Sequence, residues 1–138
     1  MAEIKRKISL RDLNPPKAKG DDDIEWICES LSLFTKKDSD KSAYKIFRSL
    51  LKSSLEGDPK TSAEIADEMD LARGTVLFHM KKFSNSGLVR RAPGRKYVLR
   101  ESCLEDTIDD MMRDAERMFE RMKRIAAEID REFGFERR

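Results

Sequence analysis

The sequence predicts a mainly α-helical protein that carries one small β-hairpin and ends in a long helix. Three observations predict this class. Apolar residues recur at helical spacing in successive segments between residues 21 and 85. The spacing changes to that of two short strands on either side of Pro93-Gly94. The last segment, about 102–133, has no glycine or proline and repeats its apolar residues in steps of three and four.

Composition limits the classes of protein to consider. The 138 residues are enough for one compact domain with extensions. No apolar stretch reaches the length of a membrane span, and the N-terminus lacks the apolar segment of a secretory signal, so we expect a cytoplasmic protein without membrane contact. Gln is absent and Asn occurs only twice, a balance typical of thermophiles.

Charge is unevenly distributed along the chain. Residues 1–20 carry a net charge of +4, residues 21–57 carry −2, residues 58–100 carry +4 and residues 101–138 carry −4. Such a separation of basic and acidic segments is frequent in nucleic-acid-binding proteins. It favours nucleic acid as a partner even though the whole chain carries only +2.

The N-terminal third is expected to hold an arm and one helix. Residues 1–20 are expected to form a flexible basic arm because of the breakers Asn14-Pro15-Pro16, although a short strand through Ile8 is the alternative. Residues 21–36 are expected to form a helix that begins in an acidic run suited to a helix N-terminus. We expect this helix to contact a partner chain through Trp26, Ile27 and Leu31.

Residues 40–100 are expected to form one domain. Thr61, followed three positions later by Glu64, is the pattern of a capping box, and Pro93-Gly94 is a strong turn signal. The predicted elements are helices over about Asp40–Leu55, Thr61–Met69 and Ala72–Asn85, and strands over Leu88–Arg91 and Lys96–Leu99.

A short helix, a tight turn, a second helix and a strand pair form the layout of a winged helix–turn–helix, whose second helix enters the major groove of DNA. Within this span, Ile46–Leu51, Thr61–Ala66, Thr75–Phe83 and Ser86–Arg91 resemble the corresponding segments of ArsR-type transcription regulators. The resemblance covers about residues 41–100, and the chain resembles an archaeal or thermophile-like member. It implies a homodimer, paired through terminal helices, on double-stranded promoter DNA with an inverted repeat.

The DNA contacts are expected on the outward side of the helix at 72–85 and in the wing. At about 100° per residue, Val76, Met80 and Phe83 face inward. Arg73 is expected to bind guanine, and Thr75 and the lysines to bind phosphate. The expected DNA-binding residues are Thr61, Arg73, Gly74, Thr75, Leu77, Phe78, Lys81 and Lys82 on the helices and Arg90, Arg91, Arg95 and Lys96 in the wing.

Four residues of this helix depart from a simple reading surface. Leu77 and Phe78 are apolar where the resemblance implies polar readers, so they either contact thymine methyl groups or pack on the protein. Ala72 stands where the resemblance implies a hydroxyl cap. His79, the single histidine, is interpreted as a helix-edge residue bonded to backbone or phosphate rather than as a catalytic or metal-binding group.

The segment 101–134 is expected to form a dimerisation helix. Its apolar residues form a heptad seam that is joined by a second stripe, and a face that wide predicts packing against both its own domain and a partner. The expected interface residues of this helix are Leu104, Ile108, Met111, Ala115, Met118, Phe119, Met122, Ile125 and Ile129.

No pattern for catalysis or for a cofactor is visible. Cys28 and Cys103 lie far apart and outside any CxxC pair, which argues against metal sensing and leaves a disulfide between them as an open alternative. Without a phosphate-binding loop or a nucleophile motif, an enzyme is not expected. The expected function is a homodimeric, sequence-specific transcription regulator; the alternative is a winged-helix interaction subunit of a larger transcription assembly, with the basal machinery as a partner.

Overall fold

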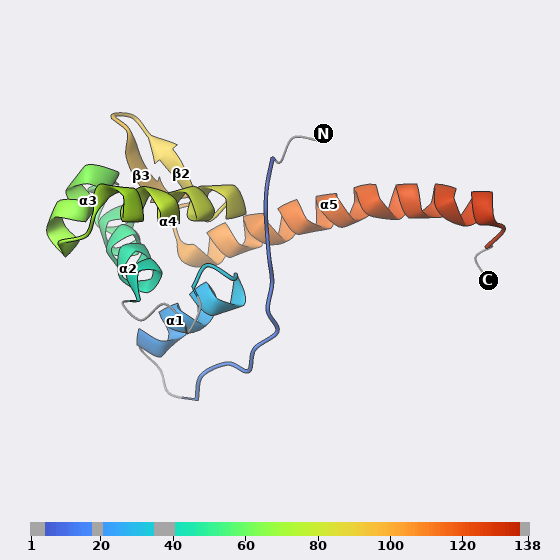
Figure 1. Cartoon of the computed structure of the whole chain (residues 1–138), viewed down its shortest axis with the longest axis horizontal. Helices are drawn as coiled ribbons and strands as arrows, with labels where there is room; N and C mark the ends of the chain where they lie inside the picture. The colour runs from blue at the N-terminus through green and yellow to red at the C-terminus, as the bar shows by residue number, and fades with distance from the viewer. Residues whose placement is uncertain (1–4, 18–20, 35–40, 136–138) are drawn as a thin grey trace.

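The computed structural model describes residues 5–17, 21–34 and 41–135 (Figure 1). Helix α1 (Asp21–Ser30) precedes α2 (Ser42–Leu55), and the two-residue strand β1 (Lys60–Thr61) leads into α3 (Ser62–Met69). Helix α4 (Arg73–Ser86) is followed by strands β2 (Val89–Ala92) and β3 (Lys96–Leu99) and by the helix α5 (Leu104–Phe133). The predicted class, mainly α-helical with a small hairpin and a long last helix, is confirmed.

The core lies where α2, α4 and the sheet meet. Helix α2 contributes Ile46, Phe47 and Leu50, which are fully buried because they share one face of the helix. The Phe47 ring meets the Phe83 ring of α4 edge-on at 5.9 Å between centroids, an arrangement that adds about 0.5–1.5 kcal/mol beyond burial. The core therefore holds α4 by its inner face and leaves the other face at the surface.

The sheet has three strands rather than the two predicted. Its order is β1-β3-β2, with β3 antiparallel to both neighbours, and Lys60 and Thr61 of β1 lie opposite Tyr97 and Lys96. The hairpin turns where predicted, with Gly94 at φ 83° and Arg95 at φ 60°. Strand β1 was not predicted because two residues are too few to show an alternating pattern.

The described part of the predicted flexible arm is anchored to the domain. Residues 5–17 have no regular secondary structure, but the Lys7 N–H donates to the Asn85 carbonyl oxygen at 2.8 Å and the Arg11 N–H donates to the Ser30 carbonyl oxygen at 2.7 Å. These bonds join the segment to the ends of α4 and α1. Residues 5–17 of the predicted flexible arm thus contact the domain through backbone hydrogen bonds.

The first helix ends earlier than predicted. Helix α1 stops at Ser30, the chain turns at Ser32, which has a φ of 57°, and Phe34 is buried in the core. Residues 35 and 36 of the predicted helix lie outside the described part of the chain, as does Asp40 at the predicted start of α2.

Helix α5 has two parts with different surroundings. Thr107, Met111 and Asp114 in its first part are buried against the domain, whereas every residue from Phe119 to Phe133 is exposed. Figure 1 shows this second part extending away from the rest of the chain. None of the described helices has the length and apolar character required to cross a membrane.

Two residues of the predicted dimer surface lie inside the protomer. Met111 is 4% exposed and Leu31 is 9% exposed, and both belong to the core cluster. The inclusion of these two residues in the dimer surface is therefore corrected. The helical pattern placed them on an apolar face but did not show that the chain's own domain covers that part of the face.

Candidate nucleic-acid interface

The start of α3 is closed by a complete capping box. The Glu64 N–H donates to Thr61 Oγ1 and the Thr61 N–H donates to Glu64 Oε1, each at 3.1 Å. This hydrogen bond from the Thr61 backbone lowers the pKa of Glu64. The hydroxyl oxygen of Thr61, an expected DNA contact, thus serves as a helix cap, which orients the N-terminus of α3.

A tight turn sets α4 across α3. Asp70 ends α3 in the left-handed region at φ 53°, and the Leu71 N–H donates to the Ala66 carbonyl oxygen at 3.0 Å. Helix α4 then begins after Ala72, which has extended backbone angles but makes no side-chain cap bond. Alanine has no side-chain acceptor, so α4 lacks the kind of cap that Thr61 gives to α3.

The two faces of α4 agree with the predicted division. Val76, Met80 and Phe83 have no exposed surface. Leu77 is 46% exposed and Phe78 is 57% exposed, so neither packs into the core. The other outward residues of the helix also lie as predicted, with Arg73, Gly74, Lys81 and Lys82 exposed and Thr75 half-buried.

His79 lies between these two faces and is mostly buried. Its ring meets the Phe78 ring edge-on at 5.3 Å and stacks on the Phe83 ring at 6.4 Å between centroids. The Lys82 ammonium lies 4.6 Å from the centroid of the Phe78 ring, within the range of a cation–π contact. These contacts hold the exposed Phe78 ring in one orientation.

The wing carries exposed cations along β2 and at its turn. Arg90, Arg91 and Arg95 are exposed and Lys96 is half-buried. The Arg91 guanidinium lies 5.3 Å from the centroid of the Tyr97 ring and donates to the Tyr97 hydroxyl oxygen at 3.2 Å. Packing against Tyr97 thus orients this arginine along the surface of the sheet.

A hollow of about 350 Å³ connects the wing to the helices. Leu77 of α4 lines it together with Arg91 and Arg95 of the wing. The other two lining residues, Ser62 and Tyr97, were not among the predicted contacts. The separation of these five residues along the chain explains the omission, because no local pattern connects α3 to the sheet. The outward face of α4 and the wing form one continuous surface.

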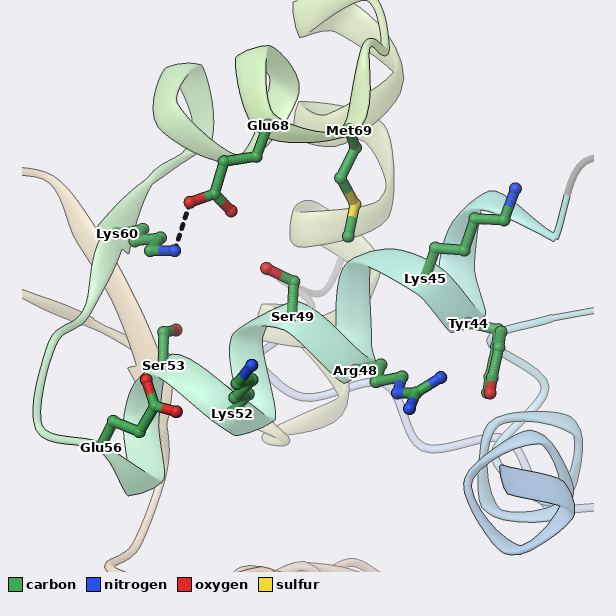
Figure 2. Close-up of a pocket in the computed structure, with 10 residues that line it drawn as sticks. All are labelled: Tyr44, Lys45, Arg48, Ser49, Lys52, Ser53, Glu56, Lys60, Glu68 and Met69. Atoms are coloured by element: carbon green, nitrogen blue, oxygen red, sulfur yellow. Dashed lines mark hydrogen bonds and ion pairs between the residues drawn. The ribbon is translucent and has the colours of Figure 1, made fainter. Parts of the chain in front are cut away.

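A larger groove, of about 660 Å³, lies on the outer side of α2. Figure 2 shows Lys45, Arg48 and Lys52 along this helix, with an ion pair between Lys60 and Glu68 at one side. No lining residue of the groove belongs to α4, β2 or β3. Its cations are therefore separate from the predicted DNA-binding surface. The groove is not part of that surface, although it is larger than the hollow at the wing.

An ionic cluster around Asp114 joins this domain to α5. The carboxylate of Asp114, whose side chain is 4% exposed, accepts from Arg100 Nη1 at 2.6 Å, pairs with Arg6 Nε at 3.2 Å and accepts from Arg117 at 3.1 Å. The Arg100 hydrogen bond, with further bonding to Arg117, lowers the pKa of Asp114 although burial opposes the shift. This cluster was not predicted because its members come from three distant segments of the chain.

Glycine is required beside this cluster. Gly87 ends α4 at a φ of 87°, a left-handed conformation that favours glycine. A Cβ atom there would lie 2.9 Å from Arg100 Nη1 and 3.2 Å from the Arg6 side chain. The absence of a side chain at Gly87 thus allows both arginines to reach Asp114.

The cysteines form no site together. Both are free thiols, Cys28 buried in α1 and Cys103 at the start of α5, where its Sγ accepts weakly from the Asp106 N–H at 3.5 Å. Burial, together with the charges of Glu25 and Glu29, raises the pKa of Cys28 to about 12. Within residues 5–17, 21–34 and 41–135, no group of three or more His, Cys, Asp and Glu side chains is placed to hold a metal ion.

Helix α3, the turn at Asp70, helix α4 and the β2–β3 wing together define a winged helix–turn–helix. Comparison with protein families agrees, because residues 39–92 match the family model of a helix-turn-helix domain. This match indicates a protein that binds DNA and takes part in transcription regulation. Comparisons with curated proteins and with solved structures found no match.

Proposed function

We propose that the protein is a sequence-specific transcription regulator that binds promoter DNA as a homodimer. The observation that supports this proposal most directly is the continuous surface formed by the outward face of α4 and the basic wing, with Leu77, Arg91 and Arg95 around one hollow. A helix fits the major groove of B-DNA, where base edges differ most, and a wing beside it reaches the phosphate backbone.

The division of roles follows from the chemistry of the exposed groups. Arg73 lies at the N-terminal end of α4, where a guanidinium can donate two hydrogen bonds to a guanine. Arg90, Arg91 and Arg95 carry exposed positive charge, which suits phosphates. Contacts to phosphates position the domain without reading sequence. Affinity is therefore expected to fall steeply with salt.

The second half of α5 supports a homodimer of the ArsR type. Phe119, Ile125 and Phe133 are 66%, 56% and 71% exposed, although they belong to an apolar stripe. A helix of this kind is not stable in isolation, and pairing with a second copy removes the stripe from water. Near α1, Ile27 shares a surface groove of about 520 Å³ with Leu104 and Ile108, and this groove extends the proposed interface.

A two-fold dimer would present two α4 helices to one duplex. The expected target is an inverted repeat whose half-sites are separated by a whole number of helical turns. A selection from random duplexes, followed by footprinting, identifies the site. Two protected half-sites related by symmetry are the expected result, and a single asymmetric footprint contradicts the dimer.

The DNA-binding surface is tested with two charge-matched triple variants. Arg90→Ala, Arg91→Ala and Arg95→Ala together are expected to abolish specific binding. The salt slope of the remaining nonspecific binding is expected to fall by about 0.9 for each phosphate that the variant no longer neutralises. The control removes three cations from the groove on α2 through Lys45→Ala, Arg48→Ala and Lys52→Ala, and binding is expected to persist. Fluorescence anisotropy on the selected duplex measures both. Equal reductions of affinity in the two variants contradict the proposed surface.

The apolar outward residues favour one alternative, a winged-helix subunit that binds another protein of a transcription assembly. Leu77 and Phe78 on α4 and the stripe on α5 offer the apolar surface that such contacts use. Under this alternative, the variant with the three wing arginines replaced still binds the protein partner. The selection from random duplexes then yields no preferred sequence. Under the proposed function the same variant no longer binds DNA.

A further inference from the structure

The outward face of α4 has few groups that can bond to base edges. Among its exposed residues before the last turn, Arg73, Lys81 and Lys82 end in cations and Gly74 has no side chain. Thr75 is half-buried, so its hydroxyl is only partly available. The centre of this face is occupied by Leu77 and Phe78, which are about half exposed. Hydrogen bonds from this part of the face therefore come mainly from cationic donors, which suit the acceptors of guanine, and its centre offers apolar contact.

We propose that Leu77 and Phe78 read the C5-methyl groups of thymine, and equally of 5-methylcytosine, in the major groove. This inference rests on the proposed function and specifies what its recognition helix detects. The C5-methyl is the apolar group that a base pair presents in the major groove, and apolar side chains are its natural partners. Each base pair with a thymine is thereby distinguished from the others without a hydrogen bond.

Charge complementarity identifies DNA as the occupant of this apolar patch. Lys81 and Lys82 border the patch on α4, and Arg91 and Arg95 face Leu77 across the hollow of about 350 Å³. Among the described residues, no carboxylate lines that hollow. An apolar patch bordered by cations fits a polyanion with methyl groups at the floor of its groove.

The contacts of Phe78 with its neighbours support a contact of defined geometry with the DNA. The edge-on contact with His79 and the Lys82 ammonium 4.6 Å from the ring centroid hold the aromatic ring in place. A ring with neighbours on two sides has less conformational freedom to lose on binding than a ring without them. Leu77, one residue earlier, extends the same apolar surface toward the wing.

The test uses deoxyuridine, which differs from thymidine only in lacking the C5-methyl. Each dT of the selected duplex is replaced in turn by dU, and affinity is measured by fluorescence anisotropy. Burial of one methyl corresponds to about fourfold in affinity. We expect a loss of about fourfold at one or two positions in each half-site and no loss at dU outside the footprint. A 5-methylcytosine introduced at a dC neighbouring these positions is a second probe of methyl contact.

Leu77→Ala and Phe78→Ala identify the side chains responsible. At the position that the replaced side chain contacts, each variant is expected to bind the dT and dU duplexes with equal affinity. Arg73→Ala is the control, and it is expected to keep the loss of affinity on replacement of dT by dU. Both residues are exposed, so the variants are expected to keep the wild-type melting temperature. The dU effect is also expected to be independent of salt, because no phosphate is involved.

The outcomes separate this inference from the proposed function. A wild-type protein that binds its selected duplex with full affinity at every dU position overturns methyl reading and leaves the proposed function intact. The same holds if Leu77→Ala and Phe78→Ala weaken dT and dU duplexes by equal factors. Failure to select any duplex overturns the proposed function and this inference together.

Discussion

Arg100 Nη1 donates to Asp114 Oδ2 at 2.6 Å and thereby joins the end of the wing to the long helix α5. A second guanidinium nitrogen of Arg100 reaches the other carboxylate oxygen at 3.3 Å, so the pair is bidentate. Arg6 Nε lies 3.2 Å from the same carboxylate and its Nη1 donates to the Ser84 carbonyl oxygen at the end of α4. The orientation of α5 relative to the DNA-binding domain is therefore set by this buried carboxylate.

Replacement of Asp114 by asparagine is expected to destabilise the fold. Asp114→Asn removes the carboxylate charge that the half-buried guanidinium groups of Arg100 and Arg6 share, and leaves Arg100 only its longer contact with Asp110 at 3.7 Å, which costs about 2–3 kcal/mol of unfolding free energy. Urea unfolding at neutral pH and fixed protein concentration measures the loss. The matched control is Asp109→Asn, whose partner Arg113 is an exposed residue on the same helix, and it is expected to change stability little. Equal effects at the two positions contradict the buried role.

The contribution of Asp114 should depend on pH in a defined direction. Because the Arg100 hydrogen bond lowers its pKa below the ordinary value of 3.8, the contribution is fully present above that value and is lost as pH falls through the lower pKa of the folded state. The stability difference between the wild type and Asp114→Asn is thus expected to be constant from neutral pH to mild acid and to shrink only below 3.8. Urea midpoints recorded across this range provide the check, and a decline already at mild acid would falsify the assignment.

Two neighbouring alanines of α5 provide a matched test of the dimer. At about 100° per residue, Ala126 lies about 40° from Met122 on the apolar stripe and Ala127 lies about 140° away. Both are exposed in the protomer, so aspartate at either position has a similar effect on the isolated helix. Ala126→Asp is expected to give a monomer and Ala127→Asp a dimer by sedimentation equilibrium. Identical behaviour of the two variants argues against pairing through this stripe.

The start of the recognition helix can be strengthened. Ala72 has the extended angles of an N-cap residue, with φ −66° and ψ 141°, but no side-chain oxygen. Ala72→Ser supplies a hydroxyl acceptor for an exposed N–H of α4 and is expected to raise stability by about 1 kcal/mol. Thr61→Ala, which removes the existing cap of α3, is expected to lower it by a similar amount. Chemical denaturation measures both, and a destabilised Ala72→Ser variant contradicts the cap geometry.

The two thiols should differ in reactivity. Cys28 is fully buried and burial raises its pKa to about 12, so almost no thiolate forms near neutral pH, whereas Cys103 is half-buried. Iodoacetamide at mildly alkaline pH is expected to alkylate Cys103 in the native protein and to spare Cys28, as read by peptide mass spectrometry. In denaturing urea both should react. Equal native rates contradict the burial of Cys28, and a Cys28–Cys103 disulfide is disfavoured because both are free thiols.

Several features of the interface could be predicted from short-range patterns. The inward and outward residues of α4 follow from helical periodicity, so the burial of Val76 and the exposure of Phe78 were both predictable. The capping box at Thr61 and the turn at Pro93-Gly94 depend on residues within three positions of one another. Each of these features arises from interactions inside one element, which the order of residues along the chain describes directly.

Features that join distant segments appeared only with the fold. Strand β1 exists because Thr61 pairs with Lys96, and Asp114 gathers arginines from the arm, from the end of the wing and from its own helix. The burial of Leu31 and Met111, which periodicity had assigned to a partner chain, has the same origin. Amphipathic spacing in a helix shows which face avoids water. The packing of the whole chain decides whether its own domain or another molecule covers that face.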